Sequence, residues 1–494
     1  MKVTINSSVS ARESEASPSA GAYERLPDAE YLPLRSHAER VARGKSARRN
    51  HPLDAHARWR PSKHRADPIA VLEQQALQRE PSLVPLRYGR MSRTPFAFYR
   101  GGAAIMAGDL AGTPTAGFMS QLCGDAHLLN FGMFETPERS LVFSLNDFDE
   151  TLPGPFEWDV KRLAASIEIA GRDLGHSRGQ REASVQASVH AYRVAMLEFA
   201  SMRNLEVWHA RLPAKEFQRY LKKRAGRESG NVVRKKIRKA LTRDHLRAFD
   251  RLIEADGADL RFVSRPPIVV PVEEMLDQHQ RERYVEVIRD FLHQYRESLP
   301  SESRTLLESY RFMHMARKVV GVGSVGTRAW VVLLMGRDEG DPLMLQLKEA
   351  QPSVLEPYVG ASRHGSHGRR VVEGQRLMQS ASDEMLGWYR LRALDDRMHD
   401  FYVRQLWDGK ASIEVADLDR AGLLAYGEMC GWTLARGHAR SGERVAIATY
   451  LGEGDKFDRS IAEFAATYAD MNELDHERLL DAVASGRLRA VKRI

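Results

Sequence analysis

The strongest constraint on the fold is the way helix-type and strand-type segments are grouped along this chain of 494 residues. Apolar positions at helical spacing dominate residues 67–310, apart from strand-like stretches near 119–123 and 131–145. Strand-like segments dominate from about residue 316, and the chain from Leu418 onward is helical again. Because strands and helices do not alternate one by one, the order predicts an α+β fold rather than a parallel α/β sheet.

The same grouping predicts four parts. Residues 1–66 are polar and rich in Ser, Ala, Arg and Pro, which predicts a flexible basic arm. Residues 67–310 are expected to form a mostly helical large lobe, and residues 311–415 a β-rich small lobe. Residues 416–494 are expected to be C-terminal helices that complete the large lobe.

Charge and cysteine content narrow the classes of protein. Lys and Arg total 74 against 66 for Asp and Glu, and the net charge is +8. The basic segments 36–65 and 222–243 could contact phosphate or nucleic acid weakly, or could be a solvated arm and a solvated helix face. No membrane span or secretory signal is visible, and Cys123 and Cys430 are too few for a disulfide framework, so we expect a cytoplasmic protein.

A loop with the sequence GDAHLLN carries the first catalytic candidates. Asp125 and Asn130 have the D-x-x-x-x-N spacing of a kinase catalytic loop, in which the carboxylate accepts a hydroxyl proton and the amide oxygen binds Mg²⁺. Taken alone, the pair is more typical of local loop capping. The predicted hairpin that follows ends at Asp147, which returns a carboxylate to the loop, and Asp149 would share its face. The set predicts a metal site made by Asn130, Asp147 and Asp149.

A second group of candidates lies in the β-rich part. Gly321, Gly323 and Gly326 form a G-x-G-x-x-G pattern between two predicted strands, whereas a dinucleotide-binding pattern would lead into a helix. Glycines at a β-hairpin are typical of the kinase loop that covers nucleotide phosphates. The alternative is an ordinary tight turn.

The next strand and helix complete this group. Lys348, in the apolar strand LMLQLKEA, would hold the α- and β-phosphates, and Glu373 in the following helix would pair with it. Glu349 is adjacent to Lys348 and should therefore face the opposite way. The strand FYVRQLWD would be a hinge, with Gln405 and Leu406 near the adenine.

Four further residues have simpler interpretations. Arg100 precedes paired glycines and could contact phosphate, the acidic cluster or a structural carboxylate. Asp109 is expected to cap a helix or loop, and His438 to lie near a helix C-terminus as a partner of its dipole. Trp158 is expected to pack in the core.

The segments GDAHLLN, SLNDFDE and PGPFEWD resemble the catalytic core of the aminoglycoside and choline phosphotransferases, which are kinase-like small-molecule kinases. The resemblance covers about residues 122–165. It implies that Asp125 is the base, that Asn130 and Asp147 hold the metal, and that His127 and Asp159 brace the loop. It also implies ATP and Mg²⁺ as cofactors and a two-lobe fold.

Longer stretches resemble an uncharacterised bacterial family, catalogued as domain of unknown function 2252. They run from RMSRTPFAFYRGG, near Met91, through GVGSVGTRAWVVLL and VVEGQRLMQSASDEMLGW to FYVRQLWDGK. This family name implies no activity.

The kinase-like parts occur in an unusual order, because the catalytic loop and metal carboxylate precede the glycine pattern and the lysine. A circularly permuted kinase-like fold would explain this order, since chain ends that lie together on a surface permit such permutation. The alternative is that the resemblance is confined to residues 122–165.

Three functions remain open. The first is an ATP- and Mg²⁺-dependent phosphotransferase that acts on a hydroxyl of a small molecule or protein, with the acceptor pocket in the helical insert 203–310. AMP transfer would use the same residues. The second is a metal-dependent phosphoester hydrolase that uses Asp125, His127, Asp147 and Asp149. The third is a non-catalytic nucleotide-binding protein or a basic nucleic-acid partner.

Overall fold

The computed structural model describes residues 35–241, 249, 251–256, 259–319, 325–393, 395–406, 411 and 413–491. Its helices are α1 (His37–Asn50), α2 (Pro68–Ala76), α3 (Val84–Met91), α4 (Pro95–Gly101), α5 (Ala103–Ala111), α6 (Phe156–Asp173), α7 (Arg178–Ser201), α8 (Asn204–His209), α9 (Ala214–Leu241), α11 (Gln278–Ser298), α12 (Ser301–Leu307), α13 (Glu356–Val359), α14 (His367–Met378), α15 (Arg420–Ser441), α16 (Arg444–Leu451) and α17 (Lys456–Ala484).

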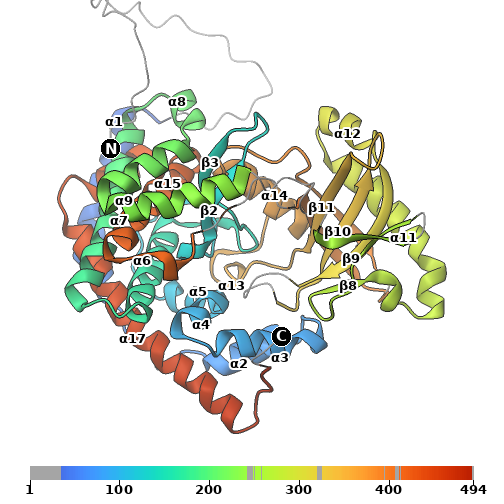
Figure 1. The fold of residues 1–494 in the computed structure, drawn as a ribbon. Coiled ribbons are helices and arrows are strands. Elements are labelled where there is room, and N and C mark those ends of the chain that lie inside the picture. The colour runs from blue at the N-terminus through green and yellow to red at the C-terminus, as the bar shows by residue number, and fades with distance from the viewer. Residues whose placement is uncertain are drawn as a thin grey trace, which may run out of the picture.

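The strands are β1 (Met119–Leu122), β2 (Phe131–Glu135), β3 (Leu141–Leu145), β4 (Leu152–Pro155), β5 (Leu212–Pro213), β6 (Ile253–Asp256), β7 (Asp259–Phe262), β8 (Val269–Pro271), β9 (Arg311–Lys318), β10 (Ala329–Met335), β11 (Pro342–Glu349), β12 (Gly387–Arg392) and β13 (Met398–Gln405). Figure 1 shows a helical part built around α6, α7 and α15, and a separate sheet with α11 beside it. The α+β expectation is confirmed.

The segment expected to be a flexible arm is ordered from residue 35 onward, so that prediction is wrong for this stretch. A capping box between Ser36 and Glu39 starts α1, which buries Gly44 and Ala47 and packs along α16. Farther along, the Arg65 guanidinium contacts the carboxylates of Asp109 and Asp475 at 2.7 and 2.6 Å. Residues 1–34 lie outside the described residues.

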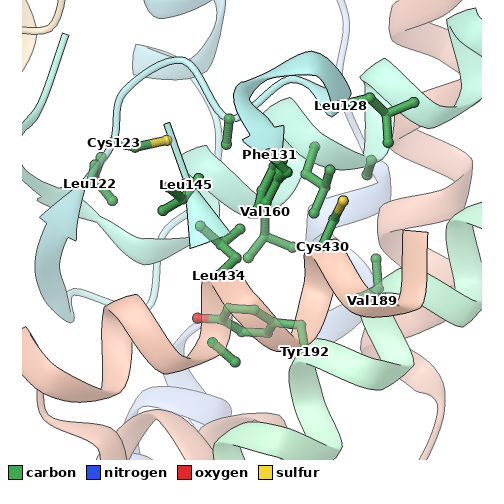
Figure 2. Packing of buried hydrophobic residues seen from close by; sticks show 14 of the residues in the cluster. Leu122, Cys123, Leu128, Phe131, Leu145, Val160, Val189, Tyr192, Cys430 and Leu434 are labelled. Atoms are coloured by element: carbon green, nitrogen blue, oxygen red, sulfur yellow. The ribbon is translucent and has the colours of Figure 1, made fainter. Parts of the chain in front are cut away.

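The helical core lies directly beneath the predicted catalytic loop. The pattern at 160–202 predicts one long helix, but the chain breaks into α6 and α7 at Gly175, whose φ of 71° is a left-handed conformation that favours glycine. Cys123 and Leu128 of the loop pack into the same cluster as Val160 of α6 and Leu434 of α15 (Figure 2). Both cysteines are buried free thiols. The loop therefore rests on a rigid base.

Two small antiparallel pairs frame the loop. Strands β2 and β3 form the predicted hairpin, with Phe131 opposite Leu145, and β1 pairs with β4. Most of their residues are buried, which fixes the register of each pair. As a result, the segments before and after GDAHLLN are both held by antiparallel strand pairing.

The third part is an antiparallel sheet with the order β12-β13-β11-β10-β9-β8. Helix α11 packs on one face, where Phe291 and Tyr295 meet Leu345 and Leu347. Met344, which directly precedes Leu345, belongs to a second apolar cluster on the other face. Lys348 alternates with Leu347 and therefore lies on the face opposite α11. The strands expected in TRAWVVLLMG and LMLQLKEA are confirmed as β10 and β11. Strand β9 begins at Arg311, earlier than the first strand expected from about residue 316.

Helix α14 joins the sheet to the helical part. The sequence predicts a helix across VVEGQRLMQSASDEMLGW, but α14 ends at Met378 and Gly387 already begins β12. Gly374 is essential to the join, because a Cβ atom there would lie 2.4 Å from the Thr151 side chain. Most of the second basic segment lies on α9, where Lys222 and Lys223 are exposed. No helix in the described part of the chain has the length and apolar character needed to cross a bilayer.

Candidate active site

A cleft of about 810 Å³ lies where the helical part, the loop and the sheet meet. Asp125, Asp147, Asp149, Glu150 and Lys348 line it and are here called the acidic wall. Arg79, Arg87 and Arg100, from the segment that spans α2 to α4, also line it and are here called the arginine wall. The volume is that of a small-molecule site.

Helix α6 positions the loop through one face. Its Asp159 carboxylate accepts hydrogen bonds from the backbone N–H groups of Cys123 and Gly124 at 2.8 and 3.1 Å. Two turns farther on, the Ser166 hydroxyl accepts the N–H of Leu128 at 2.8 Å. Gly124 has φ 81°, and a Cβ atom there would lie 2.3 Å from the Glu150 carbonyl oxygen. This geometry explains the glycine of G-D-A-H.

The two carboxylate oxygens of Asp125 differ in their contacts, because only one of them accepts hydrogen bonds from Arg162. Its Oδ1 accepts from Nε and Nη2 of Arg162 at 2.9 and 2.7 Å, while Oδ2 lies 3.7 Å from Nε2 of His127. Arg162 is held in turn, because its guanidinium stacks 3.8 Å from the centre of the Tyr99 ring. The side chain of Asp125 is 21% exposed. The carboxylate is thus fixed in orientation with one oxygen left for a proton.

His127 is held in its neutral form. Burial lowers the pKa of its imidazole to about 4, and this effect outweighs the opposing attraction of Asp125. The ring lines the cleft beside Asp125. At neutral pH it can therefore donate or accept a hydrogen bond without adding charge.

Asn130 ties the loop to the end of the hairpin. Its amide nitrogen donates to the carbonyl oxygens of Asp125 and Asp147 at 2.9 and 3.0 Å, and its Oδ1 accepts the N–H of Asp147 at 2.7 Å. The residue is 3% exposed. One amide therefore fixes the separation between Asp125 and Asp147.

Lys348 reaches the acidic wall from the sheet. Its Nζ donates to Oδ2 of Asp149 at 2.7 Å and lies 3.6 Å from Oδ1 of Asp147. The Tyr402 hydroxyl donates to the other oxygen of Asp149 at 2.7 Å. Burial works against ionisation of Asp149, but Lys348 and Tyr402 keep its pKa below the usual range. Burial and the Asp149 charge raise the pKa of Asp147.

The predicted Lys348–Glu373 pair does not form. Glu373 lies 3.9 Å from Arg369 and from Arg376 on its own helix, and Lys348 pairs with Asp149. Glu349 points away from Lys348, as expected, and binds His399 at 2.9 Å. A residue other than Glu373 therefore connects α14 to the acidic wall.

That link is Arg370, which the sequence analysis missed. Its guanidinium donates to the carbonyl oxygens of Thr151, Asp149 and Gln351 at 2.7, 2.8 and 2.8 Å. Because it holds the backbone on both sides of Glu150, it fixes the acidic wall against the sheet.

The glycine and hinge candidates have different outcomes. Gly326 has φ 90° and lies in the connection between the antiparallel neighbours β9 and β10, while Gly321 and Gly323 lie outside the described residues. The Gln405 N–H donates to the Asp383 carboxylate at 2.6 Å. Leu406 is buried in the second apolar cluster of the sheet. Neither Gln405 nor Leu406 is among the residues that line the cleft.

The structure changes two of the simpler interpretations. His438 lies in the last turn of α15, near a helix C-terminus as expected, but it is fully buried and binds Tyr192 at 2.9 Å and Asp159 at 3.3 Å, so it also supports the loop brace. Asp109 caps neither a helix nor a loop, but forms the ion pair with Arg65. Trp158 is buried as expected, and Arg100 lines the cleft.

Arg162 was missed although the sequence carries a signal for it. Asp159, Arg162 and Ser166 follow the i, i+3, i+7 spacing of one helix face. Once Asp159 is assigned to the loop, the same face points Arg162 at Asp125. The brace is therefore a stripe of polar residues rather than one acid.

The donor set suits one cation held mainly by Asp147. Its side chain is 44% exposed, and Oδ1 of Asn130 keeps one lone pair after accepting the Asp147 N–H. Both oxygens of Asp149 already accept hydrogen bonds. Mg²⁺ is commonly held by one or two carboxylates together with substrate phosphates, and the residues fit that pattern. Over the described ranges, no group of three or more His, Cys, Asp and Glu side chains is arranged to hold a metal.

The fold and the cleft define a mixed α+β protein in which a helical part and an antiparallel sheet meet at a charged cleft. The chain belongs to the bacterial family described as "Uncharacterized protein conserved in bacteria (DUF2252)", whose profile matches residues 79–482. No curated protein and no solved structure matches the chain.

Proposed function

We propose that the protein is an ATP- and Mg²⁺-dependent phosphotransferase with a circularly permuted, kinase-like two-lobe fold. The observation that carries the proposal is the ion pair between Lys348 and Asp149, 199 residues apart, in the same cleft as Asp125. A lysine on the third strand of an antiparallel sheet, facing a strand-end carboxylate and a loop aspartate, is the arrangement that kinases use.

The order of elements supports permutation. Strands β9, β10 and β11 carry the glycine turn and the lysine, and α14 follows them, but this whole unit comes after the loop and hairpin. Lys348 still reaches the acidic wall. The proposal therefore assigns the phosphate-binding role to the sheet and the proton-accepting role to the loop.

Each residue has a stated role. Asp125 accepts the proton of the acceptor hydroxyl through Oδ2, with Arg162 fixing its orientation. Lys348 exchanges part of its contact with Asp149 for nucleotide phosphate oxygens. Asp147 and Asn130 would hold Mg²⁺, which neutralises the charge on the phosphates when bound. His127, uncharged at neutral pH, orients the acceptor by hydrogen bonding.

The decisive measurement is the melting temperature of the purified protein with ATP and Mg²⁺ and with each alone. A ligand at a hundredfold excess over its dissociation constant stabilises the folded state by about 2.7 kcal/mol. We expect a shift that requires both components, is lost in Asp147→Asn and is reduced in Lys348→Met. Asp338→Asn, in the exposed turn between β10 and β11, is the matched control and should keep the shift.

An acceptor screen then tests catalysis. Asp125→Asn should reduce turnover by a factor of about 100 to 10,000, the usual range for loss of a general base, while the nucleotide shift stays. Release of ADP indicates phosphoryl transfer, whereas AMP on the acceptor indicates nucleotidyl transfer. Full activity in Asp125→Asn would refute the assigned role.

The hydrolase alternative has its own outcome. It needs Asp149 as a metal ligand, whereas both oxygens of this carboxylate accept hydrogen bonds from Lys348 and Tyr402. A response to Mn²⁺ alone, with phosphoester hydrolysis and no nucleotide shift, would favour it over the kinase proposal.

A further inference from the structure

We propose that the arginine wall is an oxyanion-binding subsite that holds a phosphate or carboxylate group of the acceptor. The assignment of the bound anion to an acceptor substrate rests on the proposed function, but anion binding itself can be tested without nucleotide. It makes the acceptor a small hydroxylated anion, rather than a neutral alcohol or a cationic aminoglycoside.

Arg87 is the central observation. It is 1% exposed, lines the cleft, and its Nε and Nη1 are buried without a hydrogen-bond partner among the described residues. Only Nη2 is satisfied, by the side-chain oxygen of Gln75 at 2.9 Å and the carbonyl oxygen of Gly101 at 3.1 Å. Buried guanidinium groups normally have an ionic partner, because desolvation of the charge is costly.

Arg79 and Arg100 extend the same feature. Arg79 donates one hydrogen bond to the carbonyl oxygen of Val325 at 2.6 Å, and its Nε is buried without a partner in the described part of the chain. Nε of Arg100 is likewise buried, and no described residue accepts from it. Over the described ranges, none of the arginine-wall side chains lies within 4.0 Å of a carboxylate oxygen in an ion pair. Planar guanidinium groups suit phosphate and carboxylate through paired hydrogen bonds.

The position of Arg100 favours the acceptor over the nucleotide. Its neighbour Tyr99 receives a hydrogen bond from Arg162 at 2.8 Å, and Arg162 holds Asp125. An anion on Arg87 and Arg100 would therefore lie close to the proposed base Asp125, whereas the nucleotide phosphates are assigned to Lys348.

Other residues that line the cleft suit a small polar molecule. The amides of Gln74 and Gln75 on α2 and of Gln78 just after it line the cleft, and Ala103, Ala104 and Tyr358 supply apolar surface. Amide groups can bind hydroxyls, and the small apolar residues leave room for a carbon skeleton. The chemistry favours a phosphorylated or carboxylated polyol.

The test is a calorimetric titration with inorganic phosphate and, in a second arm, malonate. Each is run without nucleotide and again with a saturating non-hydrolysable ATP analogue and Mg²⁺. Arg100→Met removes no hydrogen bond to the described residues, and Arg87→Lys keeps the buried charge while it gives up the bonds to Gln75 and Gly101. The melting temperature of each variant checks that it folds. We expect at least tenfold weaker anion binding in each variant and an unchanged ATP-analogue affinity. Arg337→Met, 83% exposed on the sheet, is the control.

Each outcome has a defined meaning. Equal anion binding in wild type and variants, or no anion binding at all, would overturn the subsite. Parallel loss of anion and ATP-analogue binding would also overturn it, because the arginines would then serve the nucleotide. Arginine-dependent anion binding in a protein that binds no ATP analogue would support the subsite while refuting the proposed nucleotide.

Discussion

Buried arginines occur in two regions of this molecule, and their partners differ. In the helical core, Arg193 contacts both oxygens of Asp458 and Arg65 contacts Asp109 and Asp475. On the arginine wall, Arg87 is as deeply buried but has two nitrogens without a partner among the residues described. Arg193 and Arg65 are neutralised by carboxylates of the chain, whereas we assign the neutralisation of Arg87 to a ligand. The comparison separates charges that maintain the fold from charges kept for binding.

The largest expected effect is in the core. Arg193→Met should lower the free energy of unfolding by about 3–5 kcal/mol, because it leaves the Asp458 carboxylate buried without its cation. Urea denaturation at pH 7 measures this loss. The exposed control Arg337→Met should change the value by less than about 0.5 kcal/mol. If Arg193→Met lost no more free energy of unfolding than Arg337→Met, the distinction between the two regions would be refuted.

The next effect concerns an acid in the cleft. Burial raises the pKa of Glu150 from 4.5 to about 7, against the N–H of Val354 and the charge of Arg370. A raised carboxyl pKa gives stability that is complete below pH 4.5 and is lost as the pH rises through 7. Glu150→Gln removes this loss. The free energy of unfolding of the variant, measured relative to wild type, should therefore be higher at pH 8 than at pH 4 by about 1–3 kcal/mol.

Urea denaturation across that pH range measures the difference. The exposed control Glu302→Gln should follow the wild-type curve. Parallel curves for Glu150→Gln and wild type would show that Glu150 ionises in the folded protein as readily as in the unfolded chain.

The smallest effect is expected on the arginine wall. Arg100→Met removes a buried charge that donates no hydrogen bond to the described residues, so the free energy of unfolding should stay within about 0.5 kcal/mol of wild type or rise. Thermal and urea unfolding both measure it. A loss comparable to that of Arg193→Met would mean that Arg100 serves the fold rather than a ligand.

The local features of the site could be predicted from the sequence. Residues 131–145 form the expected hairpin, and the strand that carries Lys348 is correct in position and facing. These predictions rest on alternating apolar residues and on spacing within a short segment, which determine local structure directly.

The partners across the cleft could not be predicted in the same way. Arg370 and Gly374 are four residues apart and share the face of α14 that meets Thr151, whereas Glu373 lies on another face. Nothing within VVEGQR reveals which face will meet the hairpin. The same holds for the stretch 35–66, because its burial depends on α16 and α17, which are distant in sequence.

The amide of Asn130 has a consequence for motion. Since it bonds to the backbone of both Asp125 and Asp147, the loop and the hairpin end move as one body. Lys348 is held by side-chain contacts alone, and these can be exchanged. The spacing of the two aspartates is therefore set by hydrogen bonds to the backbone, and a ligand that displaces the Lys348 contacts would leave this spacing unchanged.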